Sequence, residues 1–421
     1  EFNKIYQGDV LSVLKTFPDK CIDTVMTSPP YWGLRDYNVE GQIGLEKSFE
    51  EYFTHILEVT AELKRVLKTG GSLWWNHGDS YASVGTVGGD IGNDEGMGIE
   101  RGRARIEKGS YPEKCLLLQP MRVALKMIDE QGWILRNDIV WWKRNSMPTS
   151  VKDRFANKWE HLFFFVKNKN YYFDLDSVRK PHLPISIERM NYGFSDNVSF
   201  DYTKRKKEQE IKQKEYQGKY NLNEEVSQFK DKGYQRKVLG IPHDLANVHP
   251  LGGNPGDVFD ITTQAHPFAH FACFPEKLCE TPIKSGCPEL VCDKCGEPQR
   301  KVSKGKPNVE AFNIRVRDVQ AGRIKHTDRV ASEEEIKNYD EKQYGTNYQN
   351  EGKEYVVAKG CGCNVGFHQG IVLDPFMGSG TTALVALKLN RNFVGIELNP
   401  SYIEIANKRL KPHLEQTKIH L

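Results

Sequence analysis

The chain has 421 residues, too many for one compact α/β domain and enough for a core that carries one or two insertions. Its 59 Lys and Arg against 56 Asp and Glu leave a formal net charge of +3, which excludes a polycation wrapped around nucleic acid but not a local basic face. Apolar runs reach only five residues, as at 162–166, far below the ~20 residues of a membrane span, and no basic and apolar leader opens the chain. The nine cysteines, an odd number, argue against a disulfide framework, so we expect a cytoplasmic protein with no membrane partner.

The first part of the chain has the apolar spacing of an α/β unit. Short strands are expected at residues 4–6 and 24–27, separated by a helix over residues 10–17. A Ser-x-x-Glu capping box at Ser48 predicts a second helix, which Gly70-Gly71 is expected to end. The elements expected next are a strand at 72–75, a Gly-rich mobile loop at 84–110, a helix at 119–130, a strand at 133–142 and a hairpin of residues 161–166 with 171–173.

Periodicity fades between residues 180 and 255, and order returns at Ile371. The last segment reads as a strand, a Gly-rich turn, a helix, a strand at 393–396 and a helix at 400–410. Each end of the chain is too small to form a parallel sheet alone. We therefore predict an α/β fold in which both ends build one sheet, with the ligand at the carboxyl ends of its strands.

A Gly-rich turn at residues 371–382, IVLDPFMGSGTT, has the features of a ligand loop. Gly378 and Gly380 allow a tight turn and a close approach of a ligand, and the helix that opens at Thr381 offers free N–H groups. Glu397 ends the next strand, where a carboxylate can accept both hydroxyls of a ribose. The pattern favours a nucleoside site over an ordinary turn with a surface Glu.

The segment Ser28-Pro29-Pro30-Tyr31 follows a strand directly. Its prolines fix the backbone and leave carbonyl groups free to accept hydrogen bonds, while the aromatic ring adds a flat face. Such a turn suits a flat heterocycle with an exocyclic amine, whose two hydrogens could bond Ser28 and the Pro29 carbonyl and so free the nitrogen lone pair. A Pro-rich turn with buried aromatic rings is an equal alternative for this segment alone.

Together, TSPPYW, DPFMGSGTT and IELNP resemble the DNA amino-methyltransferases that use S-adenosylmethionine, and within them the permuted β class. The resemblance implies a Rossmann-like class I methyltransferase sheet, with the catalytic tetrapeptide Ser28, Pro29, Pro30 and Tyr31 ahead of a recognition region and the cofactor motif last. It implies direct methyl transfer to a base that is rotated out of double-stranded DNA. It also implies a prokaryotic or phage cell, in which the protein is nucleoid-associated and a cognate restriction endonuclease is possible.

The resemblance assigns further residues. Those at the cofactor are Asp9, Phe271, Ala272, Asp374, Phe376, Gly378, Gly380, Thr381, Thr382, Glu397 and Asn399. Tyr31 is expected to stack on the base, with Trp32 or Trp142 as a second wall and Lys143 in the base pocket. The implied division is a catalytic half at 1–179, target recognition at 180–255, an extra cofactor motif at 256–290, an insertion at 291–364 and the cofactor half at 365–421.

The target atom is open between two exocyclic amines. Methylation of carbon-5 of cytosine is rejected, because the Pro-Cys pair of that family is absent from the sequence. Ser at position 28 resembles the group that methylates cytosine N4, whereas enzymes for adenine N6 usually carry Asp or Asn there. Cytosine N4 is therefore favoured over adenine N6. An RNA or protein-amide methyltransferase and a non-enzymatic zinc module that binds DNA are the remaining alternatives.

Two short-spaced cysteine pairs, Cys292 with Cys295 and Cys361 with Cys363, predict a structural zinc site that pins the ends of an insertion. Four unrelated reduced thiols are the alternative, and Cys287 could compete as a ligand. The basic segments 140–180, 201–240 and 296–330 are candidate surfaces for DNA, although a charge run is often only a solvated face. The sequence does not determine the oligomeric state.

Overall fold

The computed structural model describes residues 1–37, 39–83, 86–87, 111–146, 148–181, 253–264, 274–299, 301–304, 354–357 and 361–417. The chain forms two compact units, one of residues 1–178, 254–301 and 357–421, and one of residues 179–253 and 302–356. The predicted loop at 84–110 lies outside the described residues except for 86–87, and so does the region 180–255 except for 180–181 and 253–255. The following concerns the first unit unless stated otherwise.

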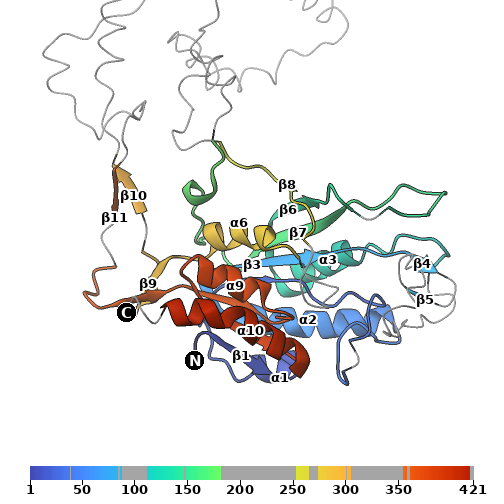
Figure 1. Cartoon of the computed structure of the whole chain (residues 1–421), viewed down its shortest axis with the longest axis horizontal. Coiled ribbons are helices and arrows are strands. Elements are labelled where there is room, and N and C mark those ends of the chain that lie inside the picture. Colours follow the sequence, from blue (N-terminus) through green and yellow to red (C-terminus); the bar gives the residue numbers. More distant parts are fainter. Residues whose placement is uncertain are drawn as a thin grey trace, which may run out of the picture. The chain divides into compact units, whose positions relative to one another are not determined.

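Among the described residues, the first unit has one eight-stranded sheet, in the order β1-β14-β13-β2-β3-β7-β6-β8. Its strands are β1 (Lys4–Gln7), β14 (Asn392–Glu397), β13 (Ile371–Asp374), β2 (Ile22–Thr27), β3 (Leu67–His77), β7 (Trp159–Val166), β6 (Ile134–Trp142) and β8 (Val258–Asp260). The first five are parallel, and β7 is antiparallel to both of its neighbours. Strands from the two ends of the chain thus lie side by side, blue beside red in Figure 1, which confirms the predicted α/β sheet built from both ends.

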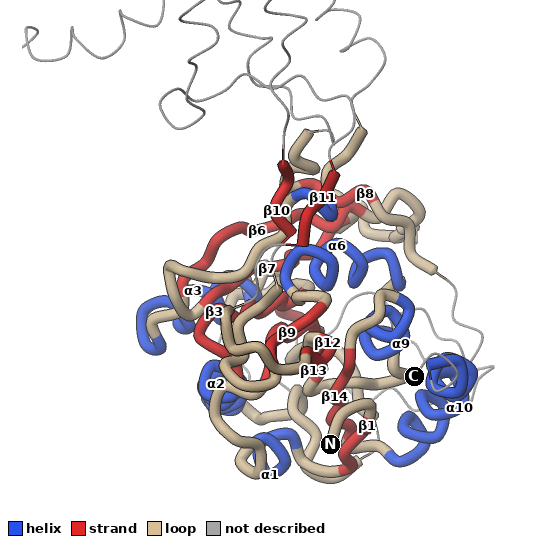
Figure 2. The backbone as a smooth tube through the Cα atoms, turned by 90° about the vertical axis from the view of Figure 1, so that its left-hand side faces the viewer, coloured by secondary structure: helices blue, strands red, loops and turns tan. Residues whose placement is uncertain are grey.

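Helices cover both faces of this sheet, as Figure 2 shows. The helices are α1 (Val10–Leu14), α2 (Phe49–Val66), α3 (Gln119–Gln131), α6 (Glu276–Gly286), α9 (Thr381–Lys388) and α10 (Pro400–Thr417), with a short 3₁₀ helix η1 (Asp176–Val178). The first three share a core with Val25 and Leu73 of the sheet, and α6, α9 and α10 share another with Met26 and Trp74. Successive strand residues point to opposite faces, so β2, which is buried at every position, and β3 supply side chains to both cores.

Helix α2 begins as predicted but ends earlier. Ser48 caps it by accepting the Glu51 N–H at 3.2 Å, and the chain turns extended at Leu67. The expectation that Gly70 and Gly71 end the helix was wrong, because both lie within β3. A Cβ at Gly71 would stand 2.8 Å from the Asp23 carbonyl oxygen, so Gly71 permits a close approach of β2 and β3 rather than a helix stop.

The hairpin predicted for residues 161–166 with 171–173 was also wrong. Strand β7 pairs with β3 on one side and with β6 on the other, so it has no free edge for residues 171–173. Those residues instead pass the start of β3, where the Tyr172 N–H donates to the Gly70 carbonyl at 2.9 Å. Helix α6, which the sequence pattern did not reveal, buries Leu278 and Ile283 against the sheet.

Three pairs of short strands complete the described elements. Strand β9 (Leu290–Cys292) pairs antiparallel with β12 (Phe367–Gln369), and β4 (Ala82–Ser83) with β5 (Thr86–Val87). The third pair, β10 (Lys301–Lys304) with β11 (Glu354–Val357), belongs to the second unit except for Lys301 and Val357. Within the described ranges, every helix is too short or too polar to cross a lipid bilayer.

Candidate functional site

A cleft opens at the carboxyl ends of the parallel strands β1, β2, β13 and β14. Its volume is about 750 Å³, including space that is open to solvent. Residues from both chain ends line it: Gly8, Asp9, Val10, Ser28, Pro30, Tyr37, Val39, Gly41, Gln42, Ile43, Pro375, Phe376, Gly378, Ile396, Glu397, Leu398, Asn399 and Tyr402. The predicted catalytic turn and the predicted cofactor turn therefore face one space.

Glu397 lines the cleft, and two backbone N–H groups hold its carboxylate, one from the Gly-rich turn after β13 and one from the residues after β14. The Gly378 N–H donates to its Oε2 at 2.7 Å, and the Asn399 N–H donates to its Oε1 at 2.8 Å. Burial raises the pKa of Glu397, and the N–H groups of Asn399 and Gly378 oppose that rise. Each carboxylate oxygen has a second lone pair, so the orientation that these bonds impose leaves acceptors for a ligand.

Asp374 lies behind the cleft, although the sequence placed it at the cofactor. Its carboxylate is buried and accepts the hydroxyls of Thr27 at 2.6 Å and Thr382 at 2.7 Å, as well as the Phe376 N–H at 3.1 Å. Burial raises its pKa to about 6. Because Thr27 ends β2 and Asp374 ends β13, this carboxylate ties the catalytic strand to the cofactor strand.

The first residues of α9 complete the Gly-rich cofactor turn. Gly380 has a φ of +82°, and a Cβ there would meet the Ala406 side chain at 3.0 Å, which explains the glycine. Thr381 is buried and accepts a hydrogen bond from Arg409 at 3.2 Å. Gly380, Thr381 and Thr382 do not line the cleft, whereas Phe376 and Gly378 do.

Asp9 caps α1 beside the cleft. Its Oδ1 accepts the Ser12 N–H at 2.9 Å and the Ser12 hydroxyl at 2.8 Å. The preceding Gly8 N–H donates to the Glu397 carbonyl at 3.1 Å, so the first loop of the chain is tied to the end of β14. Asp9 thus lines the cleft together with Glu397 and Asn399.

The catalytic turn carries a chain of hydroxyl and carboxylate groups. Ser28 Oγ and Tyr31 Oη are 3.1 Å apart, and Tyr31 Oη donates to Glu160 Oε2 at 3.2 Å. Asn76 Oδ1 is a second acceptor, 3.4 Å from Tyr31 Oη. Burial, and then the charge of Glu160, raise the pKa of Tyr31 well above its ordinary value. Pro29 is buried, and the Pro30 carbonyl accepts the Tyr52 hydroxyl at 3.0 Å.

Lys143, expected in the base pocket, forms an ion pair with Glu160. Its Nζ also lies 4.3 Å from the centre of the Trp141 ring. These groups come from neighbouring positions of the pair β6 and β7, in which Trp141 is opposite Glu160. The sequence analysis missed Glu160, and the signal was available: a charged residue near the start of the strand WEHLFFFV precedes a run of five apolar residues.

Tyr31 has one face covered by His77, with the ring centres 4.9 Å apart and an interplanar angle of 21°. His77 is buried, which lowers its pKa to about 3 and keeps the imidazole neutral at physiological pH. Tyr31 does not line the cleft itself, whereas Ser28 and Pro30 do.

The two tryptophans predicted for the base pocket differ in surroundings. Trp32 is 0% exposed, stacks on Phe49 at 4.7 Å, and donates its indole N–H to the Glu46 carbonyl at 2.9 Å. Its ring belongs to the core, so the expectation that it forms a pocket wall is corrected. Trp142 ends β6 with 40% exposure and has the Arg144 guanidinium 5.5 Å from its ring. Phe271 and Ala272 lie outside the described residues.

Several cleft residues had no predicted role. Tyr37, Val39 and Ile43 come from the loop after the catalytic turn, and Tyr402 comes from the first turn of α10. Tyr37 and Tyr402 contact edge to face at 6.3 Å. Periodicity could not find them, because they act from loops and helix ends.

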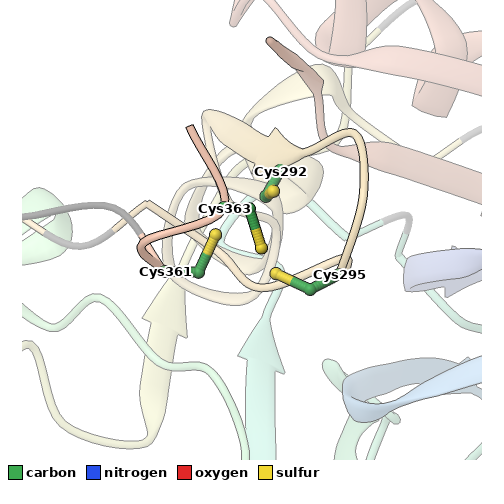
Figure 3. Close-up of side chains that lie close together, drawn as sticks. All are labelled: Cys292, Cys295, Cys361 and Cys363. Atoms are coloured by element: carbon green, nitrogen blue, oxygen red, sulfur yellow. The ribbon is translucent and has the colours of Figure 1, made fainter. Parts of the chain in front are cut away.

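The four predicted metal ligands also come together. The Sγ atoms of Cys292, Cys295, Cys361 and Cys363 all lie within 4.8 Å of one another, as Figure 3 shows. Cys287, the competing ligand, is buried outside this group.

The sequence matches the profile of a family described as DNA methylase, of the N6/N4 methyltransferase type, over residues 22–293 and 362–408. It is 44% identical over 179 residues to the Type II methyltransferase M.SfiI of Streptomyces fimbriatus, and this match spans 42% of the chain and 39% of that enzyme. It is 28% identical over 411 residues to the Type II methyltransferase M.Cfr9I of Citrobacter freundii, spanning 97% of the chain and 87% of that enzyme.

Among solved structures, the PvuII DNA methyltransferase (cytosine-N4-specific) is 17% identical with a TM-score of 0.47, over 96% of this chain and 85% of that one. The family profile covers most of the chain, including the catalytic turn, the cofactor turn and the strands that carry them. The chain therefore belongs to the N6/N4 family of DNA methylases, which use S-adenosylmethionine as the methyl donor.

Proposed function

We propose that the protein methylates the exocyclic N4 amine of cytosine in double-stranded DNA. The observation that carries the proposal is the single cleft that Ser28 and Pro30 share with Gly378, Glu397 and Asn399. A donor group held by the second set is then within reach of an amine held by the first. Membership of the DNA methylase family supports the substrate class.

The chemistry of the cleft fits S-adenosylmethionine, which supplies an electrophilic methyl group on a sulfonium when bound. Glu397 offers two oriented carboxylate oxygens for the ribose hydroxyls. Asp9 is the proposed partner of the adenine, with Phe376 and Ile43 as apolar wall. Phe271 and Ala272 remain the proposed contacts of the methionine end.

The direction of the hydrogen bonds that run from Ser28 through Tyr31 to Glu160 explains how Ser28 could accept a hydrogen bond from the amine. A carboxylate only accepts, so Glu160 takes the Tyr31 hydroxyl hydrogen at 3.2 Å. The Tyr31 oxygen can then accept from Ser28 at 3.1 Å. With its own hydrogen committed to Tyr31, Ser28 has lone pairs left for the substrate amine.

Two acceptors would then act on the same nitrogen. Ser28 Oγ and the Pro29 carbonyl would hold the two amine hydrogens and draw the nitrogen lone pair out of conjugation with the ring. The lone pair could then form a bond to the methyl carbon as the bond from that carbon to the sulfonium sulfur breaks, which leaves a neutral thioether and needs no covalent enzyme intermediate. The product sheds one proton, which we assign to water.

Such an amine is reached only after the base leaves the duplex, at a cost of a few kcal/mol. Stacking on an aromatic ring returns about 1–3 kcal/mol for each base. Tyr31 is the proposed platform through the face that His77 does not cover, and the exposed Trp142 is the proposed second wall. Lys143 is proposed to act through its ion pair with Glu160.

Residues 180–255 are the proposed target-recognition region, and the basic segments 140–180, 201–240 and 296–330 are proposed DNA-facing surfaces. Since similar proteins are named Type II methyltransferases, we also propose that the protein protects DNA from an endonuclease of the same specificity.

The test uses the full chain, isotopically labelled S-adenosylmethionine and unmethylated double-stranded DNA. Digestion to nucleosides and mass spectrometry should show labelled N4-methyldeoxycytidine, and modification-sensitive sequencing should place it at one recognition site. Labelled N6-methyldeoxyadenosine would overturn the choice of cytosine and leave the DNA methylase activity intact. An RNA substrate under the same conditions should remain unlabelled.

A further inference from the structure

Four cysteines of the first unit have no role in methyl transfer. Cys292 ends β9 and Cys295 follows it, while the other two precede β12, the antiparallel partner in which Phe367 is opposite Cys292. Strand pairing thus brings together cysteines that are far apart in the sequence. We infer that Cys292, Cys295, Cys361 and Cys363 bind one structural zinc ion, which fixes the β9–β12 ribbon at the start of the cofactor strand.

The spacing of the sulfur atoms fits this ion. A tetrahedral zinc site has Zn–S bonds of about 2.3 Å, which place its sulfurs about 3.8 Å apart. The four Sγ atoms lie within 4.8 Å of one another and point into one space (Figure 3), so a small contraction closes the tetrahedron. Four protein thiolates fill all the positions, which is the pattern of a structural rather than a catalytic zinc.

The backbone around the cysteines is shaped for this arrangement. The Gly296 N–H donates to the Cys292 carbonyl at 3.0 Å, which closes the turn after β9. Gly296 and Gly362 have φ of +70° and +76°, a left-handed conformation that glycine adopts readily. Both cysteine pairs therefore lie in tight turns.

Further contacts join the two turns beside the sulfurs. The Asp293 N–H donates to the Gly366 carbonyl at 3.0 Å, and Asp293 Oδ1 pairs with His368 Nδ1 at 2.7 Å. A Cβ at Gly366 would stand 2.5 Å from Asp293 Oδ2, so a larger residue there would make the Asp293 side chain shift.

The ribbon leads directly into the cofactor half of the sheet. Gly370 alone separates β12 from β13, and its carbonyl accepts the Asn392 N–H of β14 at 2.9 Å. A Cβ at Gly370 would overlap the Pro288 carbonyl, just before β9. The chain leaves the first unit after Lys301 and returns at Val357, between the two cysteine pairs. A zinc ion bound by both cysteine pairs would link the segment that leaves the first unit to the segment that returns to it. It would thereby fix the position at which β13 begins.

The experiment measures metal in the full chain after removal of any affinity tag. Elemental analysis should give one equivalent of zinc, and cobalt exchanged for it should show the absorption of a tetrahedral tetrathiolate site. Cys363→Ser should lose most of the metal, whereas Cys115→Ser, at a free cysteine outside the group, should retain it. Zinc in Cys115→Ser equal to that in Cys363→Ser would overturn the assignment.

A second measurement covers the case in which Cys363→Ser does not fold. A thiol-specific mercurial added to the unaltered protein should release zinc in proportion to the modified thiols, as read by a metal-sensitive dye. Release of less than a tenth of an equivalent of zinc would refute the site. Disulfide bonds among these four cysteines in protein kept under reducing conditions would refute it as well. Because none of these readouts uses methyl transfer, the zinc inference can fail while the proposed function stands.

Discussion

The cofactor turn and the catalytic turn face the same cleft but are held in different ways. Glu397 is oriented by the N–H groups of Gly378 and Asn399, all within one strand–turn–helix–strand unit. Ser28 is oriented through Tyr31 by Glu160, a residue of a distant strand. The first turn is therefore a local structure, whereas the second depends on the assembled sheet, and substitutions should separate them.

The largest effect is expected from Ser28→Ala, which removes an acceptor aimed at the reacting amine. Loss of one such positioned group lowers kcat by about 10²–10³-fold in comparable sites. Affinity for S-adenosylmethionine should change less than about threefold, because the cofactor turn is held independently. Single-turnover kinetics and calorimetry measure the two quantities, with Thr54→Ala at an exposed position of α2 as control. Equal losses in kcat and in cofactor affinity would show that the two turns are not separable.

Asp374 joins the two turns, and its pKa of about 6 predicts a pH effect on stability. Above its unfolded pKa of about 3.9 the unfolded chain releases this proton more readily, so the contribution of Asp374 to stability falls as pH rises from about 4 to 6. The fall amounts to roughly 3 kcal/mol for a shift of about two pKa units.

The substitution Asp374→Asn should remove this dependence. Urea unfolding at several pH values from 4 to 7 should show the variant gaining stability relative to the unaltered protein as pH rises. A constant difference between the two proteins over that range would show that Asp374 titrates normally. Since Asn cannot accept all the bonds from Thr27 and Thr382, a constant offset is expected in addition.

Glu397→Ala should act on the cofactor alone. Hydrogen bonds to a charged group contribute about 1.5–3 kcal/mol each, so the loss of the carboxylate should weaken S-adenosylmethionine binding by at least about tenfold. The rise in Tm that the cofactor causes should disappear, while Glu404→Ala, at an exposed site on α10, should retain it. An unchanged rise in Tm with Glu397→Ala would exclude this residue from the cofactor site.

The smallest effect is expected from Glu160→Gln, which keeps the shape of the side chain but lets it donate as well as accept. Because the hydroxyl chain could then reverse, kcat should fall by roughly tenfold, the value of about 1.4 kcal/mol for one misdirected hydrogen bond. Glu113→Gln on the surface is the matched control.

A double-mutant cycle tests whether Glu160 acts by positioning Ser28 through the Tyr31 hydroxyl. Combining Glu160→Gln with Tyr31→Phe should cost little more than Tyr31→Phe alone, because both act on Ser28 through the same hydroxyl. Additive losses would indicate that Glu160 stabilises the fold or the DNA complex independently of Tyr31.

Short-range sequence patterns were enough to predict much of the fold and part of the candidate site. The capping box at Ser48, the Gly-rich turn with Glu397 and the two cysteine pairs depend on residues a few positions apart, or on one strand and the next, so their spacing already contains their geometry. The assembly of one sheet from both ends followed from their size, because neither end could form a parallel sheet alone.

Only the tertiary structure decided which side chains reach the cleft. It placed Trp32 in the core and Asp374 behind the turn, and it brought Glu160 to Tyr31 across three strands. It also put Gly71 within β3, where the Asp23 carbonyl approaches too closely for a Cβ. These outcomes depend on contacts between distant segments, which set burial and hydrogen-bond partners and which a local pattern of residues does not contain.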